Sequence, residues 1–279
     1  FDCGEGTQRQ MMRYGTGFAI RAIFVTHLHA DHFLGIIGLL RTMGLQGREE
    51  PLHIYAPRGS GSTLQTAVEL GVDRVRFPVR IHELEPEEHV GYGEYEVRAF
   101  SVQHGTSALG YALKEKARLG RFDVEKVRSL GVPEGPLFGR LHRGEDVELN
   151  GRVIRAKDVV GPPRPGRLVV YTGDTRPAAS TGEMASGADL LIHEATFTEE
   201  EADRARETFH STARGAALLA RDARVRRLIL THVSARYAEN PSPLLEEARA
   251  AFPEAQVAHD GMSLELEYRQ EPGEAANHG

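Results

Sequence analysis

The sequence contains one cysteine and no tryptophan, and no long apolar run interrupts it. The single cysteine, Cys3, excludes a disulfide framework within the chain. No apolar stretch approaches the roughly 20 residues that a transmembrane helix needs. No basic segment followed by an apolar stretch marks a signal peptide. We therefore expect a protein without membrane contact that works in a reducing cytoplasm.

The chain also lacks a basic excess, since its formal net charge is −6, but its charge is unevenly distributed. Residues 114–167 contain 13 lysines and arginines against 8 acidic residues, a balance of +5 that leaves −11 in the remainder. All four lysines of the chain lie in this window. On charge alone, a solvated surface insertion explains the window, and contact with an anionic partner is the alternative.

Short β-rich runs alternate with helical stretches along the 279 residues, which indicates an α/β or layered αββα fold. Helices are expected at 30–44, 61–71, 211–223 and 242–252, with Ser211 and Ser242 as N-caps. The window 120–167 differs, because it is rich in Gly and Pro and its periodicity is weak. It indicates an inserted arm with some local structure. The tail from Gln270 is expected to be disordered.

Five β-rich runs deliver a histidine or an acidic residue at or near their carboxyl ends. These residues are His27, His104, Asp174, the pair His193 and Glu194, and His232. In open α/β sheets, ligands gather outside the carboxyl ends of the strands. We therefore expect these side chains to converge in the fold.

The run VTHLHADH, residues 25–32, is a dense set of metal-ligand residue types. It places His27, His29, Asp31 and His32 within six positions. Imidazole nitrogens and carboxylate oxygens suit Zn²⁺, with Mn²⁺ or Fe²⁺ as alternatives. Three strand-end residues complete a set large enough for two ions and a bridging group: His104, Asp174 and His232. Two ions that activate water and clamp the reacting oxygens predict a hydrolase.

The motif THLHADH resembles the signature of the metallo-β-lactamase superfamily. Further motifs narrow the resemblance to the ribonuclease Z family, which trims the 3′ end of tRNA precursors. These motifs are FDCGEGTQRQ, YTGDTRP, HEATF followed by HST, and LTHVSARY. They stand in the family's order, and the match spans residues 1 to about 268. The resemblance implies a four-layer αββα metallo-β-lactamase sandwich with an inserted flexible arm.

The resemblance also implies a metal-ligand set, position by position, for two zinc ions per chain. His27, His29 and His104 would hold one zinc, Asp31, His32 and His232 would hold the other, and Asp174 would bridge them. Asp31 would in addition accept a proton from the attacking water.

Glu194 and His210 match family positions that deliver a proton to the leaving 3′ oxygen. From the residues alone, His210 is also explained as an ordinary residue at a helix N-terminus. Asp2 and Glu5 are weaker candidates, because an acid at these positions either orients a ligand histidine or caps a turn.

The segment LGVPEGPLFGRL, residues 130–141, resembles the glycine-proline motif of the family's flexible arm, with Gly135 and Pro136 at its centre. A basic, glycine-rich protrusion contacts phosphates by charge. We expect four side chains to touch tRNA: Lys126, Arg128, Arg140 and Arg143. The predicted division is a core of 1–113 and 168–268, a tRNA-binding arm of 114–167 and a disordered tail of 269–279. Members of the family carry a strand and an Arg-Asn-containing loop before FDCGEG, so we expect either that this is an incomplete version of the chain or that the first strand of one sheet is lost.

The resemblance implies a zinc-dependent endoribonuclease that cuts precursor tRNA after the discriminator nucleotide. It would leave a tRNA 3′-hydroxyl and a trailer 5′-phosphate, and it would work as a homodimer. Two alternatives stay open. One is a dinuclear-zinc hydrolase of a small thioester or lactam, which would not need the basic arm. The other is an inactive tRNA-binding subunit, which would not need all seven ligands.

Overall fold

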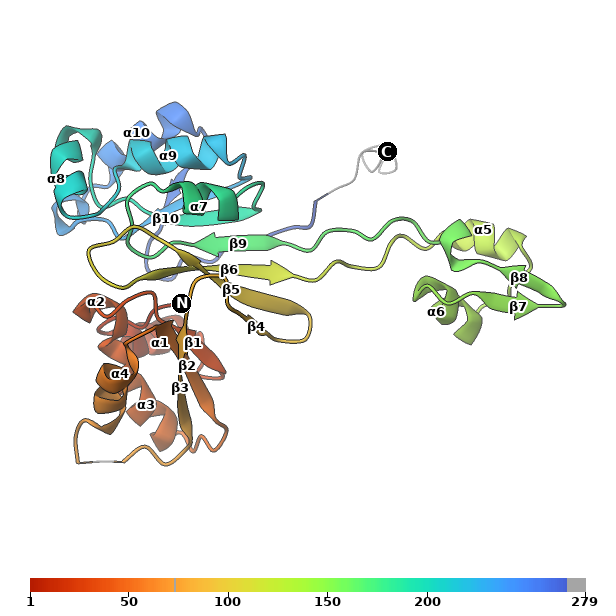
Figure 1. Cartoon of the computed structure of the whole chain (residues 1–279), viewed down its shortest axis with the longest axis horizontal. Helices are drawn as coiled ribbons and strands as arrows, with labels where there is room; N and C mark the ends of the chain where they lie inside the picture. Colours follow the sequence, from red (N-terminus) through yellow and green to blue (C-terminus); the bar gives the residue numbers. More distant parts are fainter. Residues whose placement is uncertain (73, 270–279) are drawn as a thin grey trace. The chain divides into compact units, whose positions relative to one another are not determined.

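The computed structural model describes residues 1–72 and 74–269 (Figure 1). The chain divides into two compact units. The larger, which we call the core unit, combines Phe1–Lys114 with the chain from Leu168 onward, and the smaller, the insertion unit, is Glu115–Arg167. The tail predicted to be disordered lies, from Gln270 on, outside the described residues. Among the helices of the described part, none has the length and apolar character of a membrane span.

The core unit contains two β-sheets (Figure 1). The strands of the first sheet are β1 (Ala22–Phe24), β2 (Leu52–Pro57) and β3 (Val79–Leu84). Those of the second are β4 (His89–Gly91), β5 (Tyr95–Ser101), β6 (Leu109–Glu115), β9 (Leu168–Tyr171), β10 (Leu190–Glu194), β11 (Leu228–Thr231) and β12 (Gln256–Val257). The first sheet is parallel, in the order β1–β2–β3. The second has the order β12–β11–β10–β9–β6–β5–β4, with β9 to β12 parallel and β6 antiparallel to β9.

The two sheets pack against each other through an aromatic core. Phe24 and Tyr55 of the first sheet share one buried cluster with Val97 and Tyr111 of the second. The rings of Phe24 and Tyr55 stack with centroids 4.6 Å apart, and Tyr111 meets Phe24 edge-on at 5.3 Å. The buried Tyr111 hydroxyl donates to the Val25 carbonyl at 2.8 Å, which joins the sheets by a polar contact as well.

Helices cover the outer face of each sheet. They are α1 (Thr7–Tyr14), α2 (Ala30–Phe33), α3 (Gly35–Leu45) and α4 (Gly61–Glu69) in the first half, and α7 (Ala179–Met184), α8 (Ala202–Glu207), α9 (Ala213–Asp222) and α10 (Ser242–Ala251) in the second. Leu40 and Leu64 of α3 and α4 share a core with Ile54 of β2. Ala216 and Ala217 of α9 pack with the second sheet, and their small side chains allow a close approach. The layers are helix, sheet, sheet and helix, which confirms the predicted αββα sandwich.

The four predicted helices form, with shifted ends. The stretch 30–44 becomes α2 and α3, while 61–71, 211–223 and 242–252 become α4, α9 and α10. Two predicted caps are wrong. Thr212, not Ser211, caps α9, because its hydroxyl accepts from the amide of Gly215 at 3.0 Å. Ser242 is the first helical residue, after Pro241 at the N-cap position. Ser211 is buried instead, and its hydroxyl donates to the Thr175 carbonyl at 2.6 Å.

The insertion unit has more structure than its weak periodicity indicates. It contains α5 (Val124–Ser129), α6 (Pro136–His142), the antiparallel pair β7 (Val147–Leu149) and β8 (Arg152–Ile154), and a 3₁₀ turn η1 (Ala156–Asp158). A core of its own holds it together, with Val127, Leu141 and Val147 buried in one cluster. At the start of α6, Gly135 has φ 139°, which explains a glycine before the proline at the first helical turn.

Candidate metal centre

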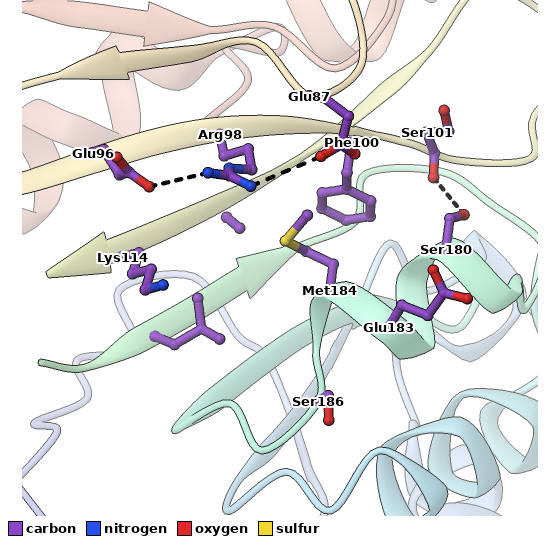
Figure 2. Close-up of a pocket in the computed structure, with 12 residues that line it drawn as sticks. Glu87, Glu96, Arg98, Phe100, Ser101, Lys114, Ser180, Glu183, Met184 and Ser186 are labelled. Atoms are coloured by element: carbon purple, nitrogen blue, oxygen red, sulfur yellow. Dashed lines mark hydrogen bonds and ion pairs between the residues drawn. The ribbon is translucent and has the colours of Figure 1, made fainter. Parts of the chain in front are cut away.

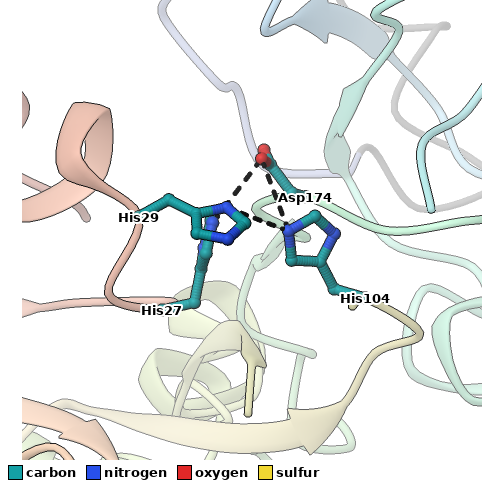
Figure 3. A group of neighbouring side chains, drawn as sticks. All are labelled: His27, His29, His104 and Asp174. Atoms are coloured by element: carbon teal, nitrogen blue, oxygen red, sulfur yellow. Dashed lines mark hydrogen bonds and ion pairs between the residues drawn. The ribbon is translucent and has the colours of Figure 1, made fainter. Parts of the chain in front are cut away.

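Seven side chains meet at the carboxyl ends of core-unit strands. His27 and His29 follow β1, Asp31 and His32 lie in α2, His104 follows β5, Asp174 follows β9, and His232 follows β11. They form two groups, in each of which the ligand atoms lie within 4.8 Å of one another: His27, His29, His104 and Asp174, and Asp31, His32 and His232. Figure 3 shows the first group, with the Asp174 carboxylate facing the imidazoles. The structure thus brings together all seven residues predicted as ligands.

Asp174 lies between the two groups. Its Oδ2 is 3.6 Å from Nε2 of His27 and 4.0 Å from Nε2 of His104. The same oxygen is 3.4 Å from Nε2 of His32 and 3.4 Å from Nε2 of His232. One carboxylate oxygen therefore faces ligands of both groups, which is the geometry that a bridging role requires.

Hydrogen bonds made on the side of a histidine ring that points away from the cluster determine which ring nitrogen faces the cluster. Four of the five histidines in the two groups use Nδ1 for such a bond. The partners are the Thr26 hydroxyl for His27 (3.0 Å), Asp2 Oδ2 for His32 (2.8 Å), the Phe209 carbonyl for His104 (3.2 Å) and the Thr196 hydroxyl for His232 (2.9 Å). A neutral imidazole that donates from Nδ1 carries its lone pair on Nε2, the atom turned toward Asp174.

Two of the inward-facing atoms have no hydrogen-bond partner among the described residues: His27 Nε2 and Asp174 Oδ1, both of which are buried. His104 Nε2 faces His29 Nδ1 at 3.3 Å. Because Nδ1 of His104 donates to the Phe209 carbonyl, Nε2 of a neutral His104 carries a lone pair. Each unpaired buried polar atom costs about 1–3 kcal/mol. Divalent cations would satisfy these lone pairs together, so the donor set fits a metal centre.

The Asp174 and Asp2 carboxylates favour a proton on His32, which a bound cation would displace, whereas His27 stays neutral. Burial opposes protonation of His32, but hydrogen bonds to Asp174 and Asp2 outweigh it and raise the pKa to about 10. Burial and the charge of His32 lower the pKa of His27 to about 3. Burial would raise the pKa of the Asp174 carboxyl, but the hydrogen bond of His32 and the charge of His232 hold it well below its usual range. The cluster therefore keeps an ionised carboxylate that attracts a cation.

Asp2 orients ligands from outside the cluster. Its Oδ2 accepts from His32 Nδ1 at 2.8 Å, from the Tyr171 hydroxyl at 2.8 Å and from the Thr26 hydroxyl at 3.0 Å, while Oδ1 accepts from the Thr26 amide at 2.7 Å. Of the two interpretations of Asp2, the geometry supports the orientation of a ligand histidine. Glu5 is exposed, and no hydrogen bond from its side chain to the cluster is found among the described residues.

The partly buried His210 and the fully buried Glu194 form a hydrogen-bonded pair beside the cluster. His210 Nδ1 lies 2.8 Å from Glu194 Oε1, and the Glu194 side chain is fully buried. The amides of Thr175 and Thr196 donate to the two carboxylate oxygens at 3.1 Å each. A ring nitrogen of His210, a carboxylate oxygen of Asp174 and a ring nitrogen of His232 lie within 4.8 Å of one another. Burial lowers the pKa of His210, but the Glu194 hydrogen bond outweighs it and the net pKa is raised.

A hollow of about 680 Å³ opens beside His210. Arg176, Arg206 and Arg214 line it together with Glu199. A second hollow, of about 400 Å³, lies where β5, β6 and β9 meet α7, and Figure 2 shows its lining. There Arg98 pairs with Glu96 and Glu87, over an apolar floor, and its lining includes none of the seven ligands. The arginine-lined hollow also has none of the seven in its lining, but it includes His210, which lies beside the cluster, and it is therefore the hollow associated with the cluster.

The residues predicted to touch tRNA lie in the insertion unit. Arg140 and Arg143 both pair with Glu145, at 3.0 and 3.3 Å, and Arg128 pairs with Glu134 at 2.6 Å. All three arginines are exposed, so their guanidinium groups can exchange a glutamate for another anion at little cost. The amide of Lys126 is capped by Asp123, and Gly135 and Pro136 begin α6.

Two threonines belong to the site, and the sequence patterns do not predict them. Thr26 precedes His27 and Thr196 follows Glu194 by two positions, and each hydroxyl contacts a ligand histidine. The available signal is position alone, because both threonines stand within the motifs that supply the ligands.

Comparisons with known proteins give a consistent result. The model of the β-lactamase superfamily domain matches residues 1–121 and 158–233. A protein of Haloferax volcanii named ribonuclease Z is 59% identical, over 100% of this chain and 89% of that protein, and one of Myxococcus xanthus with the same name is 55% identical, over 96% and 88%. The crystal structure of human tRNase Z, short form, matches with a TM-score of 0.66 and 29% identity, over 96% of this chain and 87% of that one.

Proposed function

Since the chain belongs to the ribonuclease Z family, we propose that it is a metal-dependent endoribonuclease that removes the 3′ trailer from tRNA precursors. The cut falls after the discriminator nucleotide and leaves a tRNA 3′-hydroxyl and a trailer 5′-phosphate. The observation that carries the proposal is the complete set of seven candidate ligand side chains with the hydrogen-bonded Glu194 and His210 pair beside it. A binding subunit without activity would not need either.

The residues of the site have distinct roles in this reaction. His27, His29 and His104 would hold one zinc, Asp31, His32 and His232 would hold the other, and Asp174, which faces both groups, would serve both. Two bound zinc ions would supply Lewis acidity toward water and toward the phosphate. The nitrogen and carboxylate donors also suit Mn²⁺, and loading each metal separately would rank them.

Asp31 and His210 carry out the two proton transfers of the reaction. The side chain of Asp31 is 66% exposed, so solvent reaches its carboxylate, which accepts the proton that the attacking water loses. His210 donates a proton to the departing 3′ oxygen, because the hydrogen bond to the Glu194 carboxylate raises its pKa and so favours the protonated imidazole. A departing alkoxide needs this proton, since it is a poor leaving group.

Two basic surfaces are suited to the RNA. The hollow beside His210 presents Arg206 and Arg214, whose charge suits phosphates next to the cleaved bond. In the insertion unit, Lys126, Arg128, Arg140 and Arg143 contact the backbone of the folded tRNA, with Gly135 and Pro136 shaping the segment that carries them. The family resemblance supports a homodimer, and we place its activity in the cytoplasm.

A cleavage map tests the proposal. Purified protein loaded with Zn²⁺ is incubated with a 3′-extended tRNA precursor, and the ends of the products are read at single-nucleotide resolution. A single cut after the discriminator is expected, with a 3′-hydroxyl on the tRNA. If the precursor stays intact while a small thioester or lactam is hydrolysed, the tRNA assignment is wrong.

The insertion unit can be removed cleanly for the same assay. Arg118 and Arg164 exchange two backbone hydrogen bonds of 2.8 and 3.0 Å, as an antiparallel pair does. Replacing residues 119–163 with Asn-Gly should close this pair as a two-residue hairpin and leave the core unit intact. We expect the variant to keep its metal and to hydrolyse bis(4-nitrophenyl) phosphate, but to lose cleavage of the precursor. Unchanged cleavage of the precursor would exclude a tRNA-binding role for the insertion unit.

A further inference from the structure

Phe209 has a backbone conformation that L-residues rarely adopt. Its φ is 60°, in the left-handed region, although it is neither glycine nor asparagine. Its carbonyl accepts from Nδ1 of the ligand His104 at 3.2 Å. The next residue is His210, the proposed proton donor. The backbone at Phe209 thus orients His104 through its carbonyl, and it also determines where the side chain of the next residue, His210, begins.

The Phe209 ring is held by side chains of two other loops. The Arg176 guanidinium lies over the ring, with Cζ 4.0 Å from its centroid. On the His104 loop, a Cβ added to Gly105 would stand 3.4 Å from the ring, so the ring lies directly against this glycine. The ring therefore contacts the loop after Asp174 through Arg176 and the loop after His104 through Gly105.

Arg176 is itself fixed at both ends. Its amide donates to the Gln103 carbonyl at 2.9 Å, and its guanidinium donates from Nη2 to the Arg206 carbonyl, three residues before Phe209. These bonds span the loops that carry Asp174, His104 and His210. A side chain anchored in this way keeps its rotamer without help from substrate.

We propose that Arg176 and Phe209 form a clamp that positions His104 and His210 relative to each other. Arg176 and Phe209 are thus positioning residues of the reaction. The part of this proposal that concerns His210 rests on the proposed function, whereas the orientation of His104 does not depend on it. With the ring held between Arg176 and Gly105, the left-handed backbone at Phe209 is maintained. The carbonyl then fixes the His104 tautomer that leaves Nε2 as a ligand atom.

The exposure of Phe209 separates this role from ordinary packing. The residue is 37% exposed, so the ring is not part of either sheet core. Removal of the ring should leave folding intact and alter the site. The competing explanation for an exposed ring beside an RNA-cleaving site is a base that stacks on it. That explanation predicts weaker substrate binding, whereas the clamp predicts slower turnover.

Four variants test the clamp: Phe209→Ala, Phe209→Tyr, Arg176→Gln, and Tyr14→Ala as a matched control. Tyr14 is also an exposed ring under an arginine, Arg13, but it lies at the end of α1. Each variant is loaded with Co²⁺, and its visible absorption spectrum is recorded along with the metal content. Then kcat and KM are measured on the tRNA precursor with Zn²⁺.

We expect Phe209→Ala and Arg176→Gln to change the Co²⁺ spectrum and to lower kcat about 10- to 100-fold, with KM within about 2-fold of the wild type. Phe209→Tyr and Tyr14→Ala should match the wild type in both measurements. A raised KM with kcat and spectrum unchanged would overturn the clamp in favour of base stacking. An unchanged spectrum and unchanged kinetics would also overturn it. If the wild type does not cleave the precursor, the proposed function fails, and the Co²⁺ spectra still decide whether the clamp orients His104.

Discussion

The hydroxyl oxygen of Thr196 lies 2.9 Å from Nδ1 of His232. The same oxygen lies 2.9 Å from Oε2 of the buried Glu194. A hydroxyl has one proton to donate and two lone pairs, so Thr196 donates to the carboxylate and accepts from the imidazole. His232 is thereby held in the tautomer that presents Nε2 to Asp174 and Asp31.

Thr26 repeats this arrangement on the other side of the cluster. Its hydroxyl lies 3.0 Å from His27 Nδ1 and 3.0 Å from Asp2 Oδ2. In both cases a carboxylate outside the cluster orients a ligand imidazole through a threonine. Such partners tune affinity for the metal as well as the direction of the ligand.

The substitution Thr196→Val tests this relay with almost no change in volume. Valine cannot accept from His232, so we expect the affinity for Zn²⁺ to fall about 10- to 100-fold. Competition with a chromophoric chelator measures it. Thr198→Val is the matched control, because this buried hydroxyl contacts Tyr237 at 3.1 Å instead of a ligand. Equal affinities in the wild type and Thr196→Val would show that the hydroxyl does not orient the ligand.

The substitution Asp2→Asn should affect one group of ligands more than the other. An amide nitrogen facing His32 Nδ1 favours the tautomer with a proton on Nε2, which removes a ligand atom from the group with Asp31 and His232. After dialysis against a mild chelator, we expect about one metal ion fewer per chain. Elemental analysis by mass spectrometry gives the count. Glu5→Gln, an exposed acid on the same segment, should retain the wild-type content, and a loss there would mean that the segment as a whole is sensitive.

The clustering of the predicted ligand residues was predictable from the sequence because their types are chemically distinctive and follow strands. His27, His29, Asp31 and His32 stand in one short run, and a β-rich run ends at His232. Asp2 was left between two interpretations, because a single acid near the start of the sequence gives no signal of a partner 30 residues away. The hydroxyl roles of the two threonines were not predictable, since threonine occurs throughout strands and loops.

The structure of the insertion unit could not be predicted from apolar periodicity in the sequence. Its helices α5 and α6 have 6 and 7 residues, too short for an apolar repeat to emerge. Its core gathers residues as distant as Val127 and Val159, which only tertiary structure pairs. The prediction of the α9 cap was wrong for a different reason. Ser211 and Thr212 are adjacent, and both are residue types that cap helices. The buried hydrogen bond of Ser211 to the Thr175 carbonyl leaves Thr212 as the cap.

The buried carboxylate of Asp189 should stabilise the second sheet in a pH-dependent way. It accepts from the amide of Leu168 at 2.9 Å, from Arg226 at 3.0 Å and from Arg269 at 2.9 Å. Burial would raise its pKa, but these hydrogen bonds outweigh it and lower the pKa. A lowered folded-state pKa contributes stability above the unfolded value, near 3.9, and this contribution is lost as the pH falls through the folded value.

Asp189→Asn should therefore lower the free energy of unfolding by about 1–3 kcal/mol at neutral pH. Below about pH 4 its difference from the wild type should shrink. Urea denaturation at a series of pH values measures both. Asp222→Asn, which removes an exposed partner of Arg221, should change stability by less than about 0.5 kcal/mol. A difference for Asp189→Asn that is constant with pH would mean that the loss is one of packing and not of charge.

His210→Ala should separate proton donation from metal binding. The departing 3′ oxygen of RNA needs a proton, so we expect cleavage of the precursor to fall by about 10²- to 10⁴-fold. The 4-nitrophenolate of bis(4-nitrophenyl) phosphate leaves without one, so its hydrolysis should fall far less. Metal content should stay at the wild-type level, since each of the two ligand groups is complete without His210. His89→Ala, at an exposed histidine in β4, is the control. Equal losses on both substrates, or loss of metal, would assign His210 to the metal centre instead of to the leaving group.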